Sequence, residues 1–225
     1  MRLVDEPTLV LVCRRPSPGV GKRRLARDLG EDATFMLCEL MLAAALEDLA
    51  AWPGRTVVAP AAAPDATWAR SLHDGRCSVV PQPAGNLGTR LGAIDRQLRA
   101  QGHAALLYFG SDAPALLPAD YVAARQALSR STVVLGPALD GGVTCMGSRR
   151  DWPPLEELPW STGDLHAALQ SECERAGFKV ENIATRYDID VVTDLPRLAA
   201  DLRADDRPAR RALYRALASL GYCPR

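Results

Sequence analysis

Short, continuous apolar runs recur along the chain and are separated by longer stretches with helical character. The first run covers residues 8–13, consists mainly of Leu and Val, and is bounded by Pro7 and by the turn Arg14-Arg15-Pro16. An apolar run without polar alternation is typical of a strand buried on both faces. Runs of the same kind predict further strands at residues 55–59, 77–80, 104–109, 132–135 and 178–180.

Helical stretches lie between most of these strands. Residues 32–51 are rich in Ala, Leu and Met, and Pro118 stands at the first position of a helix predicted over residues 119–129. Further helices are predicted over residues 165–176, after Asp194, and over residues 208–220. The last helix is amphipathic with a basic outer face, so we expect it to pack either on the domain or on a partner subunit of a homodimer.

The alternation of strands and helices predicts the fold class. Successive βαβ units give an α/β fold of Rossmann-like type, with a mostly parallel sheet and helices on both faces. A chain of 225 residues is long enough for one well-buried core. We therefore predict a single domain over residues 1–225, with residues 206–225 as a C-terminal helical tail.

Charge and cysteine content narrow the range of partners. The chain has 27 Lys and Arg against 27 Asp and Glu, so its net charge gives no bias toward nucleic acid or an anionic membrane. Its six cysteines form no C-x-x-C pair and have no nearby His at ligand spacing, which disfavours a zinc site and is typical of reduced cytosolic thiols. The first apolar run is too short for a signal peptide or a membrane span, so we expect a cytoplasmic protein.

The loop after the first predicted strand is a candidate phosphate site. Residues 14–24 combine a Pro/Gly turn with five cations ahead of a helix. Glycine backbone N–H groups, a helix N-terminus and Lys or Arg charges together suit the oxyanions of a di- or triphosphate, although a solvated basic turn is the structural alternative. The segment is neither a Walker A loop nor a G-x-G-x-x-G loop. Its candidate nucleotide-binding residues are Arg14, Pro18, Gly19, Lys22 and Arg24.

Carboxylates follow later strands. Asp112 comes directly after the strand predicted at residues 104–109, on the side where a parallel sheet binds its ligands. Mg²⁺ or Mn²⁺ suits such an aspartate facing a basic loop, since Mg²⁺ takes one or two carboxylates and completes its shell with water and phosphate oxygens; a turn cap before Pro114 is the alternative. Asp188 and Asp190 share one face if their segment is extended, and Asp190 is the candidate second metal ligand.

Two glycine-rich loops are further candidates for nucleotide contact. The first leads into a helix and supplies Gly85, Asn86, Gly88 and Arg90, which could reach a base or ribose. The second supplies Asp140, Gly141 and Gly142, whose glycines allow close backbone approach. An ordinary turn explains either loop equally well.

Six motifs occur together in a recognisable order along residues 9–195. They are R-x-P-x-P-G-x-x-K-x-R-L, G-x-L-G-x-R, G-S-D-x-P, G-P-A-L-D-G-G, P-W-S-T and D-I-D-x-x-x-D-L. In this order they resemble a bacterial family of small glycosyltransferase-A-like proteins in the nucleotide-diphospho-sugar transferase superfamily, associated with radical-SAM or arsenosugar pathways. More distantly the chain is similar to the guanylyltransferases for molybdenum cofactor and 2-phospholactate.

The resemblance implies a glycosyltransferase-A type of fold and roles for particular residues. The phosphate-loop Lys and Arg of the guanylyltransferases match Lys22 and Arg24, and their D-x-P aspartate matches Asp112. The chain departs from the family pattern at four places: the family usually has a lysine at Val20, an aspartate at Asn86, a glutamate at Thr89 and an aromatic pair at Val143-Thr144. Because the loop keeps Lys22 and Arg24, these departures weaken the expectation of nucleotide binding less than that of acceptor binding.

Three hypotheses for function follow. The first is nucleotidyl transfer from an NTP to a small phosphorylated acceptor, in which Lys22, Arg24 and Asp112 are the catalytic residues and Asp112 and Asp190 bind the metal. The second is glycosyl transfer from an NDP-sugar, although no D-x-D pair occurs at residues 111–113. The third is a nucleotide-binding subunit without catalysis. All three imply a nucleotide partner, and the two enzymatic ones imply a small-molecule acceptor.

Overall fold

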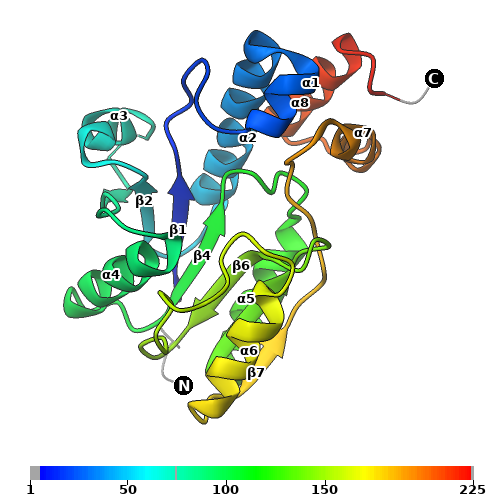
Figure 1. Cartoon of the computed structure of the whole chain (residues 1–225). Helices are drawn as coiled ribbons and strands as arrows, with labels where there is room; N and C mark the ends of the chain where they lie inside the picture. The colour runs from blue at the N-terminus through cyan, green and yellow to red at the C-terminus, as the bar shows by residue number, and fades with distance from the viewer. Residues whose placement is uncertain (1–5, 74, 224–225) are drawn as a thin grey trace.

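The computed structural model describes residues 6–73 and 75–223, and its centre is a seven-stranded sheet with the order β3-β2-β1-β4-β6-β5-β7 (Figure 1). The strands are β1 (Thr8–Cys13), β2 (Thr56–Pro60), β3 (Ser78–Val79), β4 (Leu106–Gly110), β5 (Val133–Pro137), β6 (Val143–Ser148) and β7 (Val180–Asn182). Within this sheet only β6 is antiparallel to its neighbours, β4 and β5. The predicted α/β fold with a mostly parallel sheet is confirmed, and the six predicted strands are present.

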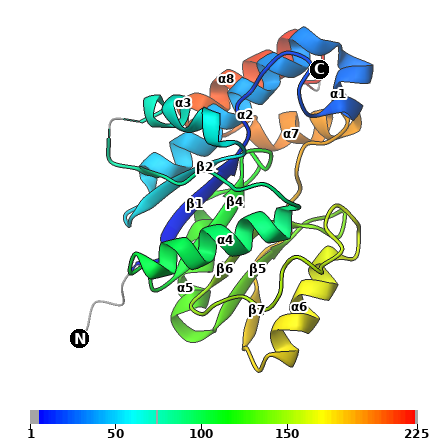
Figure 2. The same cartoon turned by 60° about the vertical axis from the view of Figure 1, so that its left-hand side comes forward.

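Helices cover both faces of the sheet, as predicted (Figure 2). They are α1 (Arg23–Leu29), α2 (Glu31–Ala51), α3 (Ala66–Ser71), α4 (Leu87–Ala100), α5 (Pro118–Arg130), α6 (Leu165–Arg175), α7 (Leu195–Leu202) and α8 (Pro208–Ser219), with short 3₁₀ turns at Ala63–Asp65 and Val192–Asp194. Alternate residues of β1 point to opposite faces. Leu9 and Leu11 pack in one buried cluster with α2, α3 and α5, whereas Val10 packs in another with α4 and α6.

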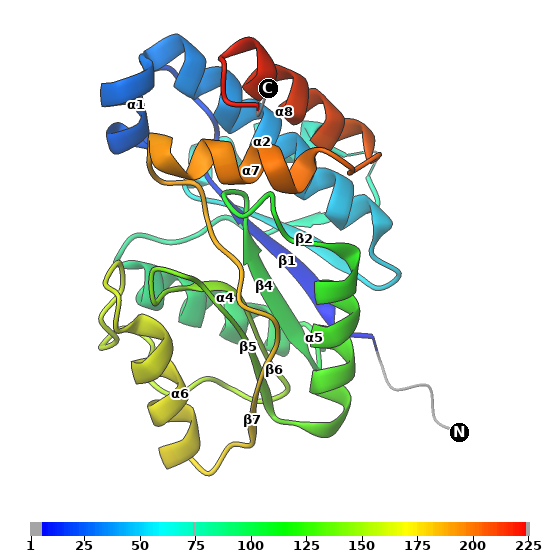
Figure 3. The ribbon, with the colours of Figure 1, turned by 90° about the vertical axis from the view of Figure 1, so that its right-hand side faces the viewer.

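A third buried cluster lies at the carboxyl ends of β1 and β4, where α1, α2, α7 and α8 meet (Figure 3). Leu213 and Leu217 of α8 are fully buried there, and they account for the apolar face of the C-terminal helix. The tail therefore packs on its own chain, chiefly along α2. None of the helices in the described residues is both long and apolar enough to cross a membrane.

Candidate active site

Three chain segments meet at the carboxyl ends of the strands. The basic loop follows β1, the segment at residues 111–117 follows β4, and the segment at residues 186–190 runs back past the same edge on its way to α7. Ile189 N–H donates to the carbonyl of Asp112 at 2.9 Å, which joins the last two segments directly. The parallel arrangement thus gathers loops that are far apart in the sequence at the usual ligand edge of such a sheet.

Lys22 is the centre of this meeting point. Its Nζ donates to Asp190 Oδ1 at 2.6 Å and to Asp112 Oδ2 at 3.2 Å, and its side chain is only 16% exposed. Burial disfavours the Lys22 ammonium, but the charges of Asp112 and Asp190 together outweigh burial and raise its pKa. The backbone of Lys22 lies in the left-handed region, at φ 43°, which is uncommon for a residue with a side chain.

Asp190 is bound from a second direction. Arg24 Nη2 donates to Asp190 Oδ2 at 2.8 Å, although most of the Arg24 side chain is exposed. Burial disfavours the Asp190 carboxylate, but Lys22 and Arg24 together outweigh burial and lower its pKa. Lys22, Arg24, Asp112 and Asp190, which the sequence motifs single out separately, therefore form one connected cluster of charges.

A basic cavity of about 660 Å³ opens on one side of this cluster. Its wall contains six cations: Arg14, Arg15, Lys22, Arg23, Arg24 and Arg90. Gln82 is buried beneath it, donates through Nε2 to the Ala59 carbonyl at 2.7 Å and accepts from Arg90 Nη1 at 2.9 Å, which holds the Arg90 guanidinium in place. This density of positive charge in a concave surface suits a polyphosphate.

An acidic cavity of about 400 Å³ lies on the other side and shares Arg24, Asp112 and Asp190 with the basic one. Asp140 and Asp188 add two carboxylates to its wall, beside Thr144 and Trp160. Burial, together with the neighbouring charges of Asp112, Asp140 and Asp190, raises the pKa of Asp188 to about 6. The two cavities therefore present opposite charge on either side of the same pair of aspartates.

The residues present fit a hard divalent cation bound by two carboxylates. Asp112 and Asp190 both point at one cation, the Lys22 ammonium, and their side chains are 44% and 35% exposed. Across the described part of the chain no group of three or more His, Cys, Asp or Glu side chains gathers in a way that could hold a metal. Mg²⁺ suits a site with two protein carboxylates, because water and phosphate oxygens complete its octahedral shell.

Several predicted nucleotide-binding residues have structural roles, and some lie outside the walls of the two cavities. Asn86 caps α4 by accepting from Thr89 N–H at 2.8 Å, and its side-chain amide donates to the Glu156 carbonyl. A Cβ on Gly88 would lie 2.0 Å from the Leu155 carbonyl oxygen, so close packing requires glycine there. Of this loop, Leu87 and Arg90 reach the basic cavity, whereas Gly85, Asn86 and Gly88 are outside its wall.

The other two loops divide in the same way. Pro18 lies at the tip of the basic loop, outside the wall of either cavity, and Gly19 lines a separate small hollow beside Glu31. In the second glycine-rich loop Asp140 and Gly142 line the acidic cavity. Gly141 instead has φ 85° and backs onto Gly163, where a Cβ would lie 1.8 Å from the carbonyl oxygen.

Other polar residues that are not among the predicted site residues also line the cavities. Arg15, Arg23 and Gln82 line the basic cavity, Asp188 lines the acidic one, and Ser161 lines both. Ser161 has φ 65°. It belongs to the P-W-S-T motif, but that motif did not lead to a prediction for Ser161 itself. The sequence around Gln82 does not indicate its role, because that role depends on contacts with Arg90 and with the distant Ala59 carbonyl.

The fold is the one seen in solved nucleotide-diphospho-sugar transferases and nucleotidyl transferases. A proposed nucleotide-diphospho-sugar transferase from Desulfovibrio desulfuricans G20 has 22% identity and a TM-score of 0.87, with 99% of this chain and 100% of that chain covered. A nucleotidyl transferase from Methanothermobacter thermautotrophicus has 19% identity and a TM-score of 0.53, covering 88% and 99%. A CMP:2-keto-3-deoxy-manno-octonic acid synthetase complexed with CTP has 13% identity and a TM-score of 0.50, covering 86% and 97%.

The chain belongs to the family described as "Uncharacterized protein conserved in bacteria (DUF2064)", whose model matches residues 42–162. No curated protein sequence matches the chain. The matched region includes Asp112 and the acidic loop at Asp140 but begins after the basic loop that contains Lys22. The resemblance to the nucleotide-diphospho-sugar transferase superfamily is confirmed for the fold.

Proposed function

We propose that the protein transfers a nucleoside monophosphate from an NTP to a small phosphorylated acceptor, with a divalent cation. The observation that carries this proposal is the basic cavity, whose wall holds six cations together with Asp112 and Asp190. A triphosphate has the charge to occupy such a wall, and its leaving pyrophosphate is stabilised by the same cations. Two neighbours with this fold, a nucleotidyl transferase and a synthetase complexed with CTP, support the choice.

The reaction assigns a task to each charged residue. An acceptor phosphate oxygen attacks the α-phosphorus, the bond from that phosphorus to the bridging oxygen breaks, and pyrophosphate leaves. Lys22 and Arg24 neutralise the phosphate charge that develops, and Asp112 and Asp190 hold the cation. A bound Mg²⁺ or Mn²⁺ would supply Lewis-acid stabilisation of the phosphate oxygens. Because an acceptor phosphate is already ionised, no general base is needed.

The acidic cavity constrains the rest of the acceptor. Asp140 and Asp188 line it, and Arg24 is its one cationic wall residue among the described residues. A second anionic group there would be repelled by unneutralised carboxylates. The acceptor's phosphate would therefore lie toward Lys22, and its uncharged or cationic remainder would occupy the acidic cavity.

Glycosyl transfer from an NDP-sugar is the second candidate. The similarity over full length to a proposed nucleotide-diphospho-sugar transferase favours it, and the acidic cavity could accept sugar hydroxyls. Ser111-Asp112-Ala113 lacks a D-x-D pair, which counts against it. A nucleotide-binding subunit without catalysis is the third, since Val20 and Asn86 depart from the family pattern that the motifs resemble.

Ligand-dependent stability and product analysis test the proposal. An Mg²⁺–NTP complex at about one hundred times its Kd should add about 2.7 kcal/mol, or about 5–10 °C in Tm, whereas the bare nucleoside should add nothing. Incubation with Mg²⁺, a panel of NTPs or NDP-sugars and phosphorylated acceptors should then release pyrophosphate. Release of free NDP would favour glycosyl transfer. Binding without either product favours the non-catalytic hypothesis, and no stabilisation by any common nucleotide at millimolar concentration refutes all three.

A further inference from the structure

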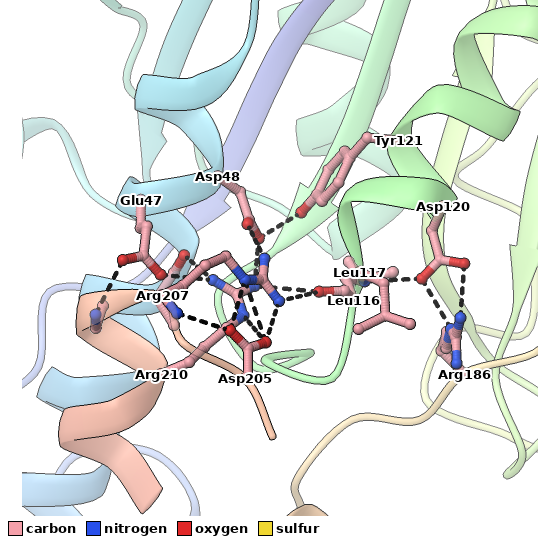
Figure 4. A network of polar contacts seen from close by, with 12 residues as sticks. Glu47, Asp48, Leu116, Leu117, Asp120, Tyr121, Arg186, Asp205, Arg207 and Arg210 are labelled. Carbon is pink, nitrogen blue, oxygen red and sulfur yellow. Dashed lines mark hydrogen bonds and ion pairs between the residues drawn. The ribbon is translucent and has the colours of Figure 1, made fainter. Parts of the chain in front are cut away.

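An ion pair between Asp120 and Arg186 lies outside the walls of both cavities. Arg186 Nε and Nη2 donate to the two carboxylate oxygens of Asp120 at 2.8 and 2.9 Å, and Figure 4 shows the two side chains facing each other. The Asp120 side chain is 4% exposed and also accepts from Leu117 N–H at 2.8 Å. Two parallel bonds from a planar guanidinium fix orientation as well as distance.

Each partner is connected to a segment that supplies one of the carboxylates bound to Lys22. Asp120 is in the first turn of α5, and its bond to Leu117 holds the end of the segment at residues 111–117, which contains Asp112. Arg186 begins the segment at residues 186–190, which ends in Asp190. The pair therefore joins the ends of the two segments.

The backbone of Arg186 also binds the loop that contains Asp140. Its N–H donates to the Pro137 carbonyl and its carbonyl accepts from Leu139 N–H, both at 2.9 Å, just before Asp140. The carbonyl of Leu116, the residue before Leu117, accepts from Arg210 Nη2 at 3.2 Å (Figure 4). The segment that contains Asp112 is thus anchored to α8 on one side and to Arg186 on the other.

We propose that Asp120 and Arg186 are positioning residues that set the spacing of Asp112 and Asp190, for Lys22 in the free protein and for a divalent cation when nucleotide is bound. The second half of this statement rests on the proposed function, whereas the first does not. Neither residue lines the basic or the acidic cavity, so neither contacts a substrate held there. Their effect reaches the site through the backbone between them and the two aspartates.

A double-mutant cycle in EDTA tests the first half. Lys22→Met should lower the urea midpoint of the wild-type protein. In the Arg186→Gln background the same substitution should lower the midpoint by no more than about half as much. Effects at independent sites add, whereas effects at coupled sites do not. Asp120→Asn, which keeps an oxygen to accept from Leu117, is the milder variant if Arg186→Gln does not fold. Equal Lys22→Met effects in both backgrounds would overturn the inference.

An Mg²⁺ titration at fixed NTP tests the second half. Arg186→Gln and Asp120→Asn should raise the half-maximal Mg²⁺ concentration about 10-fold or more, as loss of outer-shell partners does, while metal-free nucleotide binding stays unchanged. Arg130→Gln, which breaks a similar but exposed pair with Glu181, is the control and should leave the titration unchanged. An equal shift in the control, or none in the two variants, overturns the inference. If wild-type protein binds no Mg²⁺–nucleotide, the proposed function fails and the cycle alone decides the positioning role.

Discussion

Replacing Lys22 by Met removes the charge that Asp112 and Asp190 share while keeping an unbranched side chain. At an effective dielectric constant near 20, each contact is worth a few kcal/mol at most. Both aspartates are more than a third exposed, so solvent screening reduces this strongly. The two carboxylates would also be left to repel each other. We expect a net loss of about 2 kcal/mol, which corresponds to a Tm about 4–8 °C lower.

The same substitution should make the protein respond to Mg²⁺ without nucleotide. In the wild-type protein the Lys22 ammonium competes for the two carboxylates, whereas in Lys22→Met a divalent cation can take its place. At ten times its Kd the cation would restore about 1.4 kcal/mol. Turnover should nevertheless fall about 30- to 1000-fold, because Mg²⁺ does not replace the contact that Lys22 makes to the phosphates in the transition state.

Thermal unfolding in EDTA and across an Mg²⁺ series, with pyrophosphate release as the activity assay, measures both effects. Lys179→Met is the matched control, since Lys179 is exposed and its Nζ donates to the Arg130 carbonyl. Two results would refute the reasoning. One is an Lys22→Met protein as stable as wild type in EDTA, and the other is stronger stabilisation of wild type than of the variant by Mg²⁺ alone.

Three further substitutions probe the site and its support. Asp112→Asn should unfold close to the wild-type midpoint and lose Mg²⁺-dependent nucleotide binding; retained binding in a calorimetric titration would make Asp112 a turn residue only. Asp188→Asn should be about 1 kcal/mol more stable than wild type at pH 7.5 in EDTA. The pKa of Asp188 in the folded protein is about 6, above the usual value of 3.8. The stability that protonated Asp188 confers is therefore complete below pH 4 and is lost as the pH rises through 6. Urea denaturation at pH 3.5 and 7.5 checks this, and a difference that persists at pH 3.5 contradicts it. Arg210→Met should lower the free energy of unfolding by about 3 kcal/mol or more in urea denaturation, since it removes the fully buried cation that pairs with Asp48 and Glu47. A loss under about 1 kcal/mol would show that these ion pairs are dispensable.

The sequence predicts the sheet well because buried parallel strands have continuous apolar runs. It misses β6, whose residues include Thr144, Gly147 and Ser148 among the apolar ones. A local signal for β6 was nevertheless available. Asp140-Gly141 separates the apolar run of β5 from Val143, and Asp-Gly between such runs is a hairpin signal. The structure has this turn, closed by Ala138 N–H to the Gly142 carbonyl at 2.9 Å.

The glycine-rich loops contribute fewer residues to the walls of the two cavities than the sequence analysis expects. Gly88 and Gly141 both stand where another backbone passes within van der Waals contact, and a sequence cannot distinguish such a backbone from a ligand. Asn86 three residues before Thr89 fits a helix cap as well as a ribose contact, and the structure uses it as a cap. Charged residues at strand ends were the better guide, because the topology of a parallel sheet brings them together.

The conformation of Lys22 shows which feature of the basic loop the fold preserves. A residue in the left-handed region is usually Gly, and occasionally Asn or Asp, because a Cβ there costs about 1–2 kcal/mol. Lys22 adopts this conformation without a side-chain cap, and its ammonium reaches carboxylates 90 and 168 residues away in the sequence. Strain of this kind persists only where the surroundings fix it, and here two ion pairs do so. The strained conformation of Lys22 therefore brings its ammonium to both aspartates at the wall of the basic cavity.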